Sequence, residues 1–177
     1  MGVGRTIGSK TGAGVIFGAS GGVMEAALRY ALAELDPANA RSVKFSSLRK
    51  SSVFKEKTVE VGEVKIRTAV VSGLKNARKL LDDIKAGKDH YDFIEVMSCQ
   101  GGCVAGAGQP QFDGWAPRKK RAEGLYQEDT ELAYKSQDNS GVNALYGRIL
   151  DKVCGPLAHK LLHTHYHDKK DRTGQQK

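Results

Sequence analysis

The chain is poor in the residues that mark secreted and membrane-spanning proteins. Among its 177 residues are three cysteines, four prolines and one tryptophan. Three cysteines do not make the disulfide framework of a small secreted domain. No apolar run approaches the roughly 20 residues that a transmembrane helix needs, and the first residues lack the basic and then apolar layout of a signal peptide. We therefore expect a cytoplasmic protein with no membrane contact.

The remaining composition fits one ordinary globular domain with a basic surface. Apolar residues make up 40% of the chain, charged residues make up 27%, and the formal net charge is +8. Basic residues cluster at 118–121 and 169–172, but aromatic residues do not alternate with them as in a stacking platform for nucleic acid. We predict no nucleic-acid partner, and an acidic electron-transfer protein is at least as good a candidate for the basic surface.

Hydrophobic periodicity predicts an α/β fold. The predicted strands are 43–48, 57–61, 64–71 and 93–97. The predicted helices are 20–35, 76–86, 128–135, 142–153 and 157–163. Residues 113–117 are predicted to form an irregular crossing pinned to the core by Trp115. The segment 64–97 is a βαβ unit, so its two strands are predicted to be parallel.

A cysteine loop follows directly from the last strand of that unit. Cys99 and Cys103 are four residues apart, with Gly101 and Gly102 between them. Thiolates are soft ligands suited to iron–sulfur clusters, and glycines let a backbone turn tightly and aim N–H groups at cluster sulfurs. Open parallel sheets bind ligands at the carboxyl ends of their strands. Two thiolates cannot complete a cluster site, so a redox disulfide and two idle thiols remain alternatives.

Other polar and glycine-rich features have less specific interpretations. Residues 11–22 form a second glycine-rich stretch, but its spacing fits neither a dinucleotide fingerprint nor a P-loop. A loop packed against a large cofactor or a neighbouring lobe fits it better. Cys154 is predicted to be a small core residue or an incidental thiol, and Glu95 a buried, hydrogen-bonded carboxylate. The late histidines are interpreted as a polar helix end, not a metal site: His159, His163, His165 and His167.

Three ordered stretches resemble one family, the [FeFe]-hydrogenases. Residues 11–29 resemble a hydrogenase segment, and residues 93–110 resemble the family's third cluster signature. Residues 121–126, with later matches up to 166, resemble the part that some members carry as a separate small subunit. The resemblance implies one lobe of the catalytic domain, a partial parallel sheet flanked by helices, followed by a short helical extension. The implied boundaries are 1–114, 115–167 and a disordered tail at 168–177.

The resemblance also implies a cofactor, the H-cluster, which joins a [4Fe–4S] cubane to a two-iron unit. By motif position, Cys99 and Cys103 are implied cubane ligands, and Cys103 also bridges to the two-iron unit. Met97 is the implied methionine beside that unit. The other implied cofactor-contacting residues are Phe17, Gly18, Gly101 and Gly102.

The chain departs from the family pattern in ways that bear on activity. The first two cluster signatures and the proton-delivering cysteine are absent, and Ser98, Gln100 and Ala107 replace the usual residues of the third signature. A cut polypeptide, a split gene or a decayed reading frame would each explain the missing half. The resemblance therefore implies the C-terminal part of a hydrogenase, inactive alone, that needs the N-terminal half of the domain and a ferredoxin-like electron carrier. A hydrogen sensor and a cluster-assembly factor are the non-catalytic alternatives.

Overall fold

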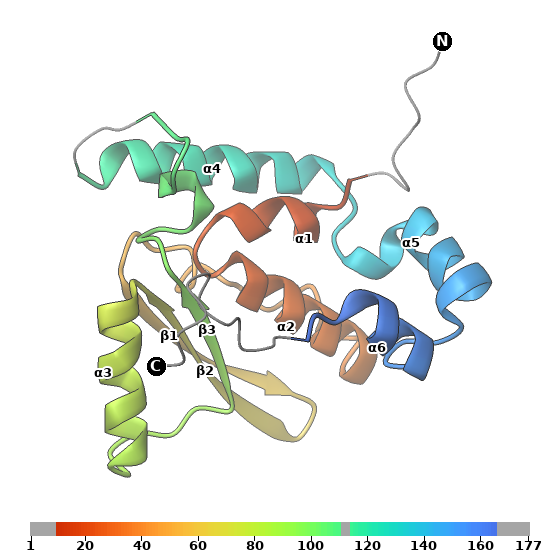
Figure 1. Ribbon diagram of the computed structural model, residues 1–177, viewed down its shortest axis with the longest axis horizontal. Helices are drawn as coiled ribbons and strands as arrows, with labels where there is room; N and C mark the ends of the chain where they lie inside the picture. Colours follow the sequence, from red (N-terminus) through yellow and green to blue (C-terminus); the bar gives the residue numbers. More distant parts are fainter. Residues whose placement is uncertain (1–9, 111–113, 166–177) are drawn as a thin grey trace, which may run out of the picture.

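The computed structural model describes residues 10–110 and 114–165, which form a mixed α/β structure (Figure 1). Helices lie on both sides of a small sheet, and α4 runs across α1 at one edge of the molecule. In chain order the elements are α1 (Gly12–Val15), η1 (Ile16–Gly18), α2 (Gly22–Leu35), β1 (Phe54–Val61), β2 (Val64–Ser72), α3 (Leu74–Lys85), β3 (Phe93–Met97), η2 (Cys103–Ala105), α4 (Ala116–Glu131), η3 (Ser136–Asp138), α5 (Ser140–Leu145), the π-helical η4 (Tyr146–Leu150) and α6 (Pro156–Leu162).

The predicted βαβ unit is confirmed. Strand β2 pairs in parallel with β3, with Thr68 opposite Phe93, and α3 connects the two strands. Strand β1 pairs antiparallel with β2 through a tight hairpin, so the strand order is β1-β2-β3. Strand β3 is therefore an edge strand among the described residues, and its carboxyl end leads into the cysteine loop.

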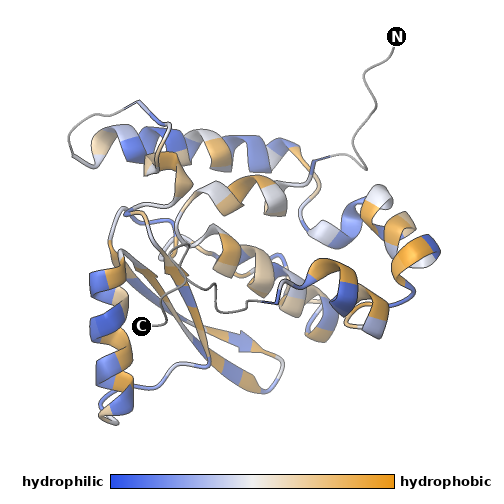
Figure 2. Cartoon of the chain, viewed as in Figure 1, coloured by the Kyte–Doolittle hydropathy of each residue, from blue (hydrophilic) through white to orange (hydrophobic). Residues whose placement is uncertain are grey.

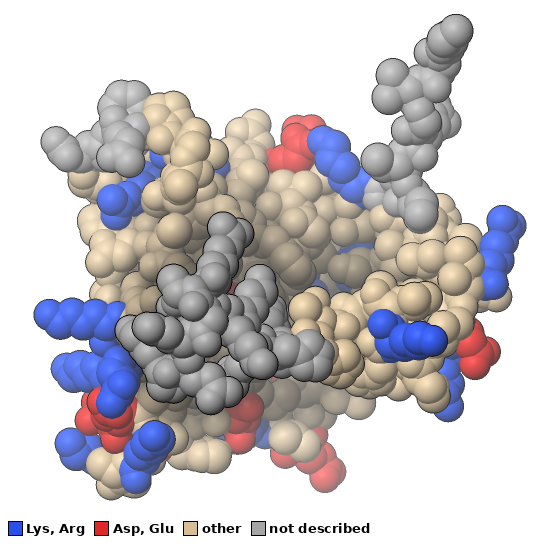
Figure 3. All heavy atoms as spheres, in the orientation of Figure 1, with Lys and Arg blue, Asp and Glu red and all other residues tan. Residues whose placement is uncertain are grey.

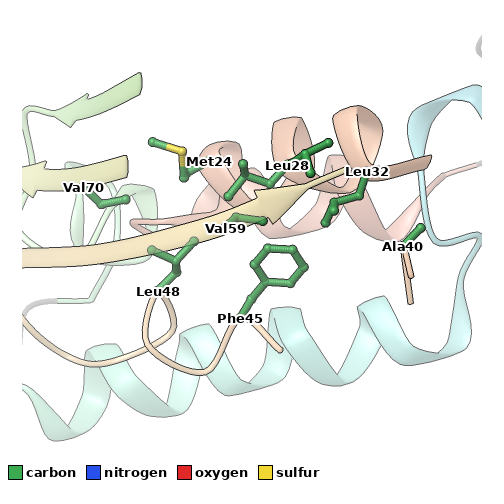
Figure 4. Packing of buried hydrophobic residues seen from close by; sticks show 9 residues of the cluster. Met24, Leu28, Leu32, Ala40, Phe45, Leu48, Val59 and Val70 are labelled. Atoms are coloured by element: carbon green, nitrogen blue, oxygen red, sulfur yellow. The ribbon is translucent and has the colours of Figure 1, made fainter. Parts of the chain in front are cut away.

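Two hydrophobic clusters lie on opposite faces of the sheet. On one face, the apolar side of α2 (Met24, Leu28, Leu32) packs against Val59 and Val70 of the sheet (Figure 4). On the other face, α3 packs against residues of β2, and its apolar residues face the sheet while its hydrophilic residues face outward (Figure 2). This amphipathic pattern explains why the sequence places helices on both faces.

The strand predicted at 43–48 is wrong. Residues 43–45 are irregular and 46–49 form a turn, in which the backbone N–H of Leu48 donates to the carbonyl of Phe45 at 2.9 Å. Phe45 and Leu48 are both buried in the α2 cluster, three residues apart on one side of the turn. Their apolar character therefore reflects a turn that covers the core, not an alternating strand.

Two predictions around α4 are only partly right. Within 113–117, residues 114 and 115 are irregular as predicted, residues 116 and 117 are helical, and Asp113 lies outside the described residues. Within 128–135, residues 128–131 are helical, but they are the last turn of a longer helix. One long helix, α4, runs from Ala116 to Glu131, and Pro117 lies in its first turn. Proline is tolerated there because the first N–H groups of a helix have no intrahelical partner. The predicted helix at 142–153 ends early, as α5 followed by η4, whereas α6 confirms the helix predicted at 157–163.

Some expectations concern residues outside the described part of the chain, including the tail at 168–177. Within 10–110 and 114–165, none of the helices is both long enough and apolar enough to span a bilayer.

Candidate functional site

The cysteine loop turns sharply at the end of β3. Gly101 and Gly102 both have positive φ angles, +92° and +91°, which residues other than glycine rarely adopt. The N–H of Gly102 donates to the carbonyl of Cys99 at 3.1 Å, and the short helix η2 begins at Cys103. The glycines thus bring the chain back past Cys99 within four residues.

Both cysteines of the loop are free and exposed. A methyl group on Gly106 would lie 3.6 Å from the Cys99 sulfur and 3.4 Å from the Cys103 carbonyl oxygen. The Cys99 sulfur and the Cys103 backbone are therefore close neighbours on one loop. Neither thiol is packed into hydrocarbon, so both are accessible to a metal or to a second polypeptide.

The two glycine-rich segments predicted at the site lie against each other. The N–H of Ser20 donates to the carbonyl of Gly101 at 3.0 Å, and a Cβ atom on Gly102 would come within 2.7 Å of the Gly18 carbonyl oxygen. Phe17 is 45% exposed beside this contact, and Met97, at the end of β3, is half-buried. The loop of 16–20 and the cysteine loop therefore form one surface.

Glu95 fixes the start of α2 beneath this surface. Its carboxylate accepts hydrogen bonds from the backbone N–H groups of Gly21 and Met24, each at 2.7 Å. An anion at a helix N-terminus satisfies free N–H groups and is stabilised by the helix dipole. Glu95 is buried and hydrogen-bonded as predicted, although the sequence did not identify its partners. The predicted helix start at Ser20 shifts accordingly to Gly22, with Gly21 before it.

Lys55 is a buried residue of this region that the sequence pattern does not reveal. Its ammonium group donates to the carbonyls of Ser20, at 2.5 Å, and Leu48, at 2.9 Å. Burial lowers the pKa of Lys55 to about 8, and the nearby charge of Glu95 only partly opposes this shift. No periodicity marks the residue, because the first two inward positions of β1, 55 and 57, are both lysines, and only the later inward positions are apolar.

The lowered pKa of Lys55 predicts a pH dependence of stability. Between pH 8 and 10 the unfolded state holds the lysine proton more tightly than the folded state, so the free energy of unfolding should rise with pH. The expected gain is about 2 kcal/mol across that window. Urea denaturation at several pH values measures it. The gain should vanish in Lys55→Met and persist in Lys65→Met, which changes an exposed lysine. A slope that survives in Lys55→Met contradicts the assignment.

Arg121 of α4 holds the cysteine loop from the other side. Its guanidinium group donates to the carbonyls of Val104, at 2.8 Å, and Pro110, at 2.6 Å. Trp115 was expected to pin an irregular crossing to the core, but it directly precedes α4. Its ring lies against Gly101 of the cysteine loop, where a Cβ atom would be 3.5 Å from the ring edge. Two residues of the α4 region thus fix the loop that carries the cysteines.

The remaining candidates lie away from this surface. Cys154 is exposed, in a turn with a φ angle of +57°, so it is not a core residue. The rings of His159, in α6, and His163, directly after α6, are tilted against each other with centroids 4.2 Å apart, and His165 is exposed. Among the described residues, no group of three or more histidines, cysteines and carboxylates could hold a metal ion. His167 lies outside them.

The family of this chain follows from its similarity to known proteins. Residues 3–107 match the family described as the iron-only hydrogenase large subunit, C-terminal domain, and residues 116–169 match the iron hydrogenase small subunit. The chain belongs to the iron-only hydrogenase family. The hydrogenase large-subunit region carries the cysteine loop, and the small-subunit region includes α4.

Individual relatives agree with the hydrogenase family. The chain is 41% identical to the NADP-reducing hydrogenase subunit HndD of Solidesulfovibrio fructosivorans, over 90% of this chain and 28% of HndD. The fold matches a solved variant of the [FeFe]-hydrogenase HydA1 of Chlamydomonas reinhardtii with a TM-score of 0.68 and 33% identity, covering 85% of this chain and 45% of that one.

Relatives that are not named hydrogenases also match. The chain is 33% identical to the cytosolic Fe-S cluster assembly factor narfl of Xenopus tropicalis, over 85% of this chain and 32% of that protein. The chain thus spans no more than about a third of these curated relatives and less than half of the solved hydrogenase.

A buried ion-pair network joins the two hydrogenase regions. Arg29 of α2 makes two bonds of 2.6 Å to the carboxylate of Asp129 in α4 and one of 2.5 Å to Glu25. Burial alone would lower the pKa of Arg29, but its hydrogen bonds to Asp129 and Glu25 outweigh burial and raise it. Arg49 completes the network by binding Glu25 at 2.5 Å. The small-subunit region is therefore attached to the large-subunit region by buried charges.

Proposed function

We propose that this chain is the C-terminal part of an [FeFe]-hydrogenase catalytic domain, in which Cys99 and Cys103 hold an iron–sulfur cluster. The observation that carries the proposal is the pair of exposed thiols on one glycine loop, at the carboxyl end of β3, in a chain of the iron-only hydrogenase family. Parallel sheets bind ligands at that edge.

The chemistry of the donor set fits half of a cluster site. Two exposed thiols are suited to iron–sulfur ligation, but a cubane usually takes four cysteines. The described residues bring no third histidine, cysteine or carboxylate together with this pair. The other ligands would come from another part of the domain, so the chain alone is expected to be inactive.

The assigned residues would act on the cofactor in distinct ways. Cys99 and Cys103 would hold the cubane, with Cys103 also bridging to the two-iron unit of the H-cluster. Met97 and the segment of Phe17 and Gly18 would pack beside that unit and exclude water, and Gly101 and Gly102 would let the loop turn tightly beside the cluster. When bound, the H-cluster supplies the redox chemistry that interconverts protons, electrons and H₂.

The missing N-terminal half of the hydrogenase domain is the proposed partner of the exposed apolar side chains near β3. Phe93 and Val96 of this edge strand are 39% and 47% exposed, although strands of parallel sheets are usually buried on both faces. Phe17, on the cysteine-loop surface, is also exposed. The coverage of 45% of the solved hydrogenase leaves enough additional chain in a complete domain to cover them.

A ferredoxin-like electron carrier is the second proposed partner. The chain carries a net charge of +8, and electrostatic steering favours an acidic carrier. Lysine and arginine side chains gather along the α3 side of the molecule (Figure 3), where Lys75, Arg78, Lys79 and Lys85 are exposed.

An iron–sulfur cluster-assembly factor is the alternative function. The match to the Xenopus assembly factor, 33% identical over 85% of this chain, supports it, but the match to the hydrogenase subunit HndD is stronger, at 41% identity. The two proposals differ in one measurable property. A hydrogenase produces H₂ once its cluster and N-terminal half are supplied, whereas an assembly factor binds a cluster and produces none.

Reconstitution with and without the N-terminal half of a hydrogenase relative tests the proposal. Alone, the chain supplied with iron and sulfide is expected to take up at most a labile cluster. Together with the other half, it should bind four irons stably, by iron analysis and electron paramagnetic resonance, and the complete H-cluster should evolve H₂.

The three cysteines of the chain provide matched variants for that experiment. Cys99→Ser and Cys103→Ser should each lose the stable cluster, because each removes a soft ligand. Cys154→Ser should retain it, because Cys154 is exposed in a turn outside the cysteine loop. A stable four-iron cluster in the isolated monomer, or normal loading in Cys103→Ser, would refute the assignment.

A further inference from the structure

Helix α4 of the small-subunit region packs against both loops of the candidate surface. A Cβ atom placed on Gly18 would lie 2.8 Å from the Leu125 side chain, and one placed on Gly101 would lie 3.7 Å from the Arg118 side chain. Gly18 belongs to the loop of 16–20, and Gly101 belongs to the cysteine loop. A helix from outside the large-subunit region therefore contacts both loops.

Arg121 makes the polar link between α4 and the cysteine loop. The two terminal nitrogens of its guanidinium group donate separately, one to the carbonyl of Val104 at 2.8 Å and the other to the carbonyl of Pro110 at 2.6 Å. These carbonyls are the two ends of the segment 104–110, so a single side chain ties both ends to α4. A guanidinium group donates in a fixed planar fork and forms charge-assisted bonds, which makes the link rigid as well as strong.

The tied segment bears on where the two cysteines lie relative to each other. Within it, the N–H of Gly106 donates to the Cys103 carbonyl at 3.0 Å, and a Cβ atom on Gly106 would be 3.6 Å from the Cys99 sulfur. The loop supplies little rigidity of its own, because it is rich in glycine, which has the most conformational freedom to lose on folding. Contacts from outside the loop must therefore hold it in one shape.

We propose that Arg121 is a positioning residue for the cluster cysteines. By tying the segment 104–110 to α4, it keeps Cys99 and Cys103 in the mutual position that a cluster requires, and it acts through the loop backbone. The ligands of a functional site must be held within about 0.5 Å of their productive geometry. The small-subunit region thereby contributes to cluster binding, although both cysteines lie in the large-subunit region. This inference rests on the proposed function of the two cysteines.

Hydrogen exchange of the isolated chain tests the hold on the loop without a cluster. Arg121→Gln should speed the exchange of the amides in 102–109 roughly tenfold, because it removes a charge-assisted bridge that opposes local opening. Exchange in β2 should not change. Lys120→Gln is the matched control, since it removes the same charge from an adjacent, exposed position and should exchange as the unmodified chain does.

Arg121→Lys separates the bridge from the charge. Lysine keeps the positive charge but lacks the planar fork, so this variant should still show most of the faster exchange. Urea denaturation verifies that each variant is folded, and Arg121→Lys carries the comparison if Arg121→Gln is not. Unchanged exchange of the amides in 102–109 in the folded Arg121 variants overturns the proposal.

Reconstitution with the N-terminal half of a hydrogenase relative tests the effect on the cluster. With iron and sulfide, Arg121→Gln should lose its irons to a chelator roughly tenfold faster than Lys120→Gln, and its reduced cluster should give a broadened electron paramagnetic resonance signal. Equal rates of iron loss in these two variants overturn the positioning role, even if their hydrogen exchange differs. The absence of a stable cluster in the unmodified chain would instead refute the proposed function, and the positioning role with it, which separates the two failures.

Discussion

Replacing Asp129 by asparagine is expected to lower the free energy of unfolding by about 3–5 kcal/mol, because it breaks a buried ion pair and leaves a guanidinium undercompensated. Arg29 is 1% exposed and binds both oxygens of Asp129 at 2.6 Å. Asparagine preserves the size of the side chain, so packing against Gly12 is retained while the charge is lost. Urea denaturation followed by circular dichroism measures the change.

An exposed ion pair is the matched control for this substitution. Arg78 and Asp82 are paired at 3.1 Å on the outer face of α3, with side chains 80% and 55% exposed. Asp82→Asn should change the free energy of unfolding by at most about 0.5 kcal/mol. Equal effects of Asp82→Asn and Asp129→Asn would mean that the buried network does not hold the small-subunit region in place.

The sequence was sufficient for the parts of the fold that depend on local patterns. The apolar run of β2, the amphipathic period of α3 and the short strand β3 each gave the correct element. Because a short parallel connection needs a helix between its strands, the topology followed. The position of Cys99 at the carboxyl end of β3 followed as well.

The wrong predictions arose where burial did not come from a regular period. Phe45 and Leu48 are buried by a turn that covers α2, and their apolar spacing imitated a strand. Helix α4 has little apolar periodicity, and its buried side chain is a carboxylate, Asp129, which pairs across 100 residues with Arg29. A pattern method expects charge on the outside of a helix, so it cannot detect a helix held by buried charge.

The site was half predictable for the same reason. The two cysteines and the glycines were identified by type and spacing. The residues that fix them were not, because Arg121 reaches Val104 and Glu95 reaches Gly21 only through tertiary packing. Single-sequence patterns give no information on which distant segments meet.

Replacing Gly102 by alanine is expected to lower the free energy of unfolding by about 4 kcal/mol, from backbone strain and overpacking together. Gly102 has φ +91° and ψ −163°, a conformation essentially confined to glycine. A Cβ atom there would lie 2.6 Å from the Ser20 nitrogen and 2.7 Å from the Gly18 oxygen. These are backbone atoms, which cannot turn away as a flexible side chain could.

Gly108→Ala distinguishes the contact from the strain. Gly108 also has a positive φ, +87°, but no atom lies within 4 Å of a Cβ placed there. Its alanine variant should lose only about 1 kcal/mol from backbone strain. The difference between the two variants therefore reports how tightly the 16–20 loop presses on the cysteine loop.

In a Cys154→Ser background, Gly102→Ala should also speed the reaction of Cys99 and Cys103 with a thiol reagent, because the loop that fixes them has moved. Equal stability and equal thiol reactivity in the two variants would mean that the two loops do not form one rigid surface.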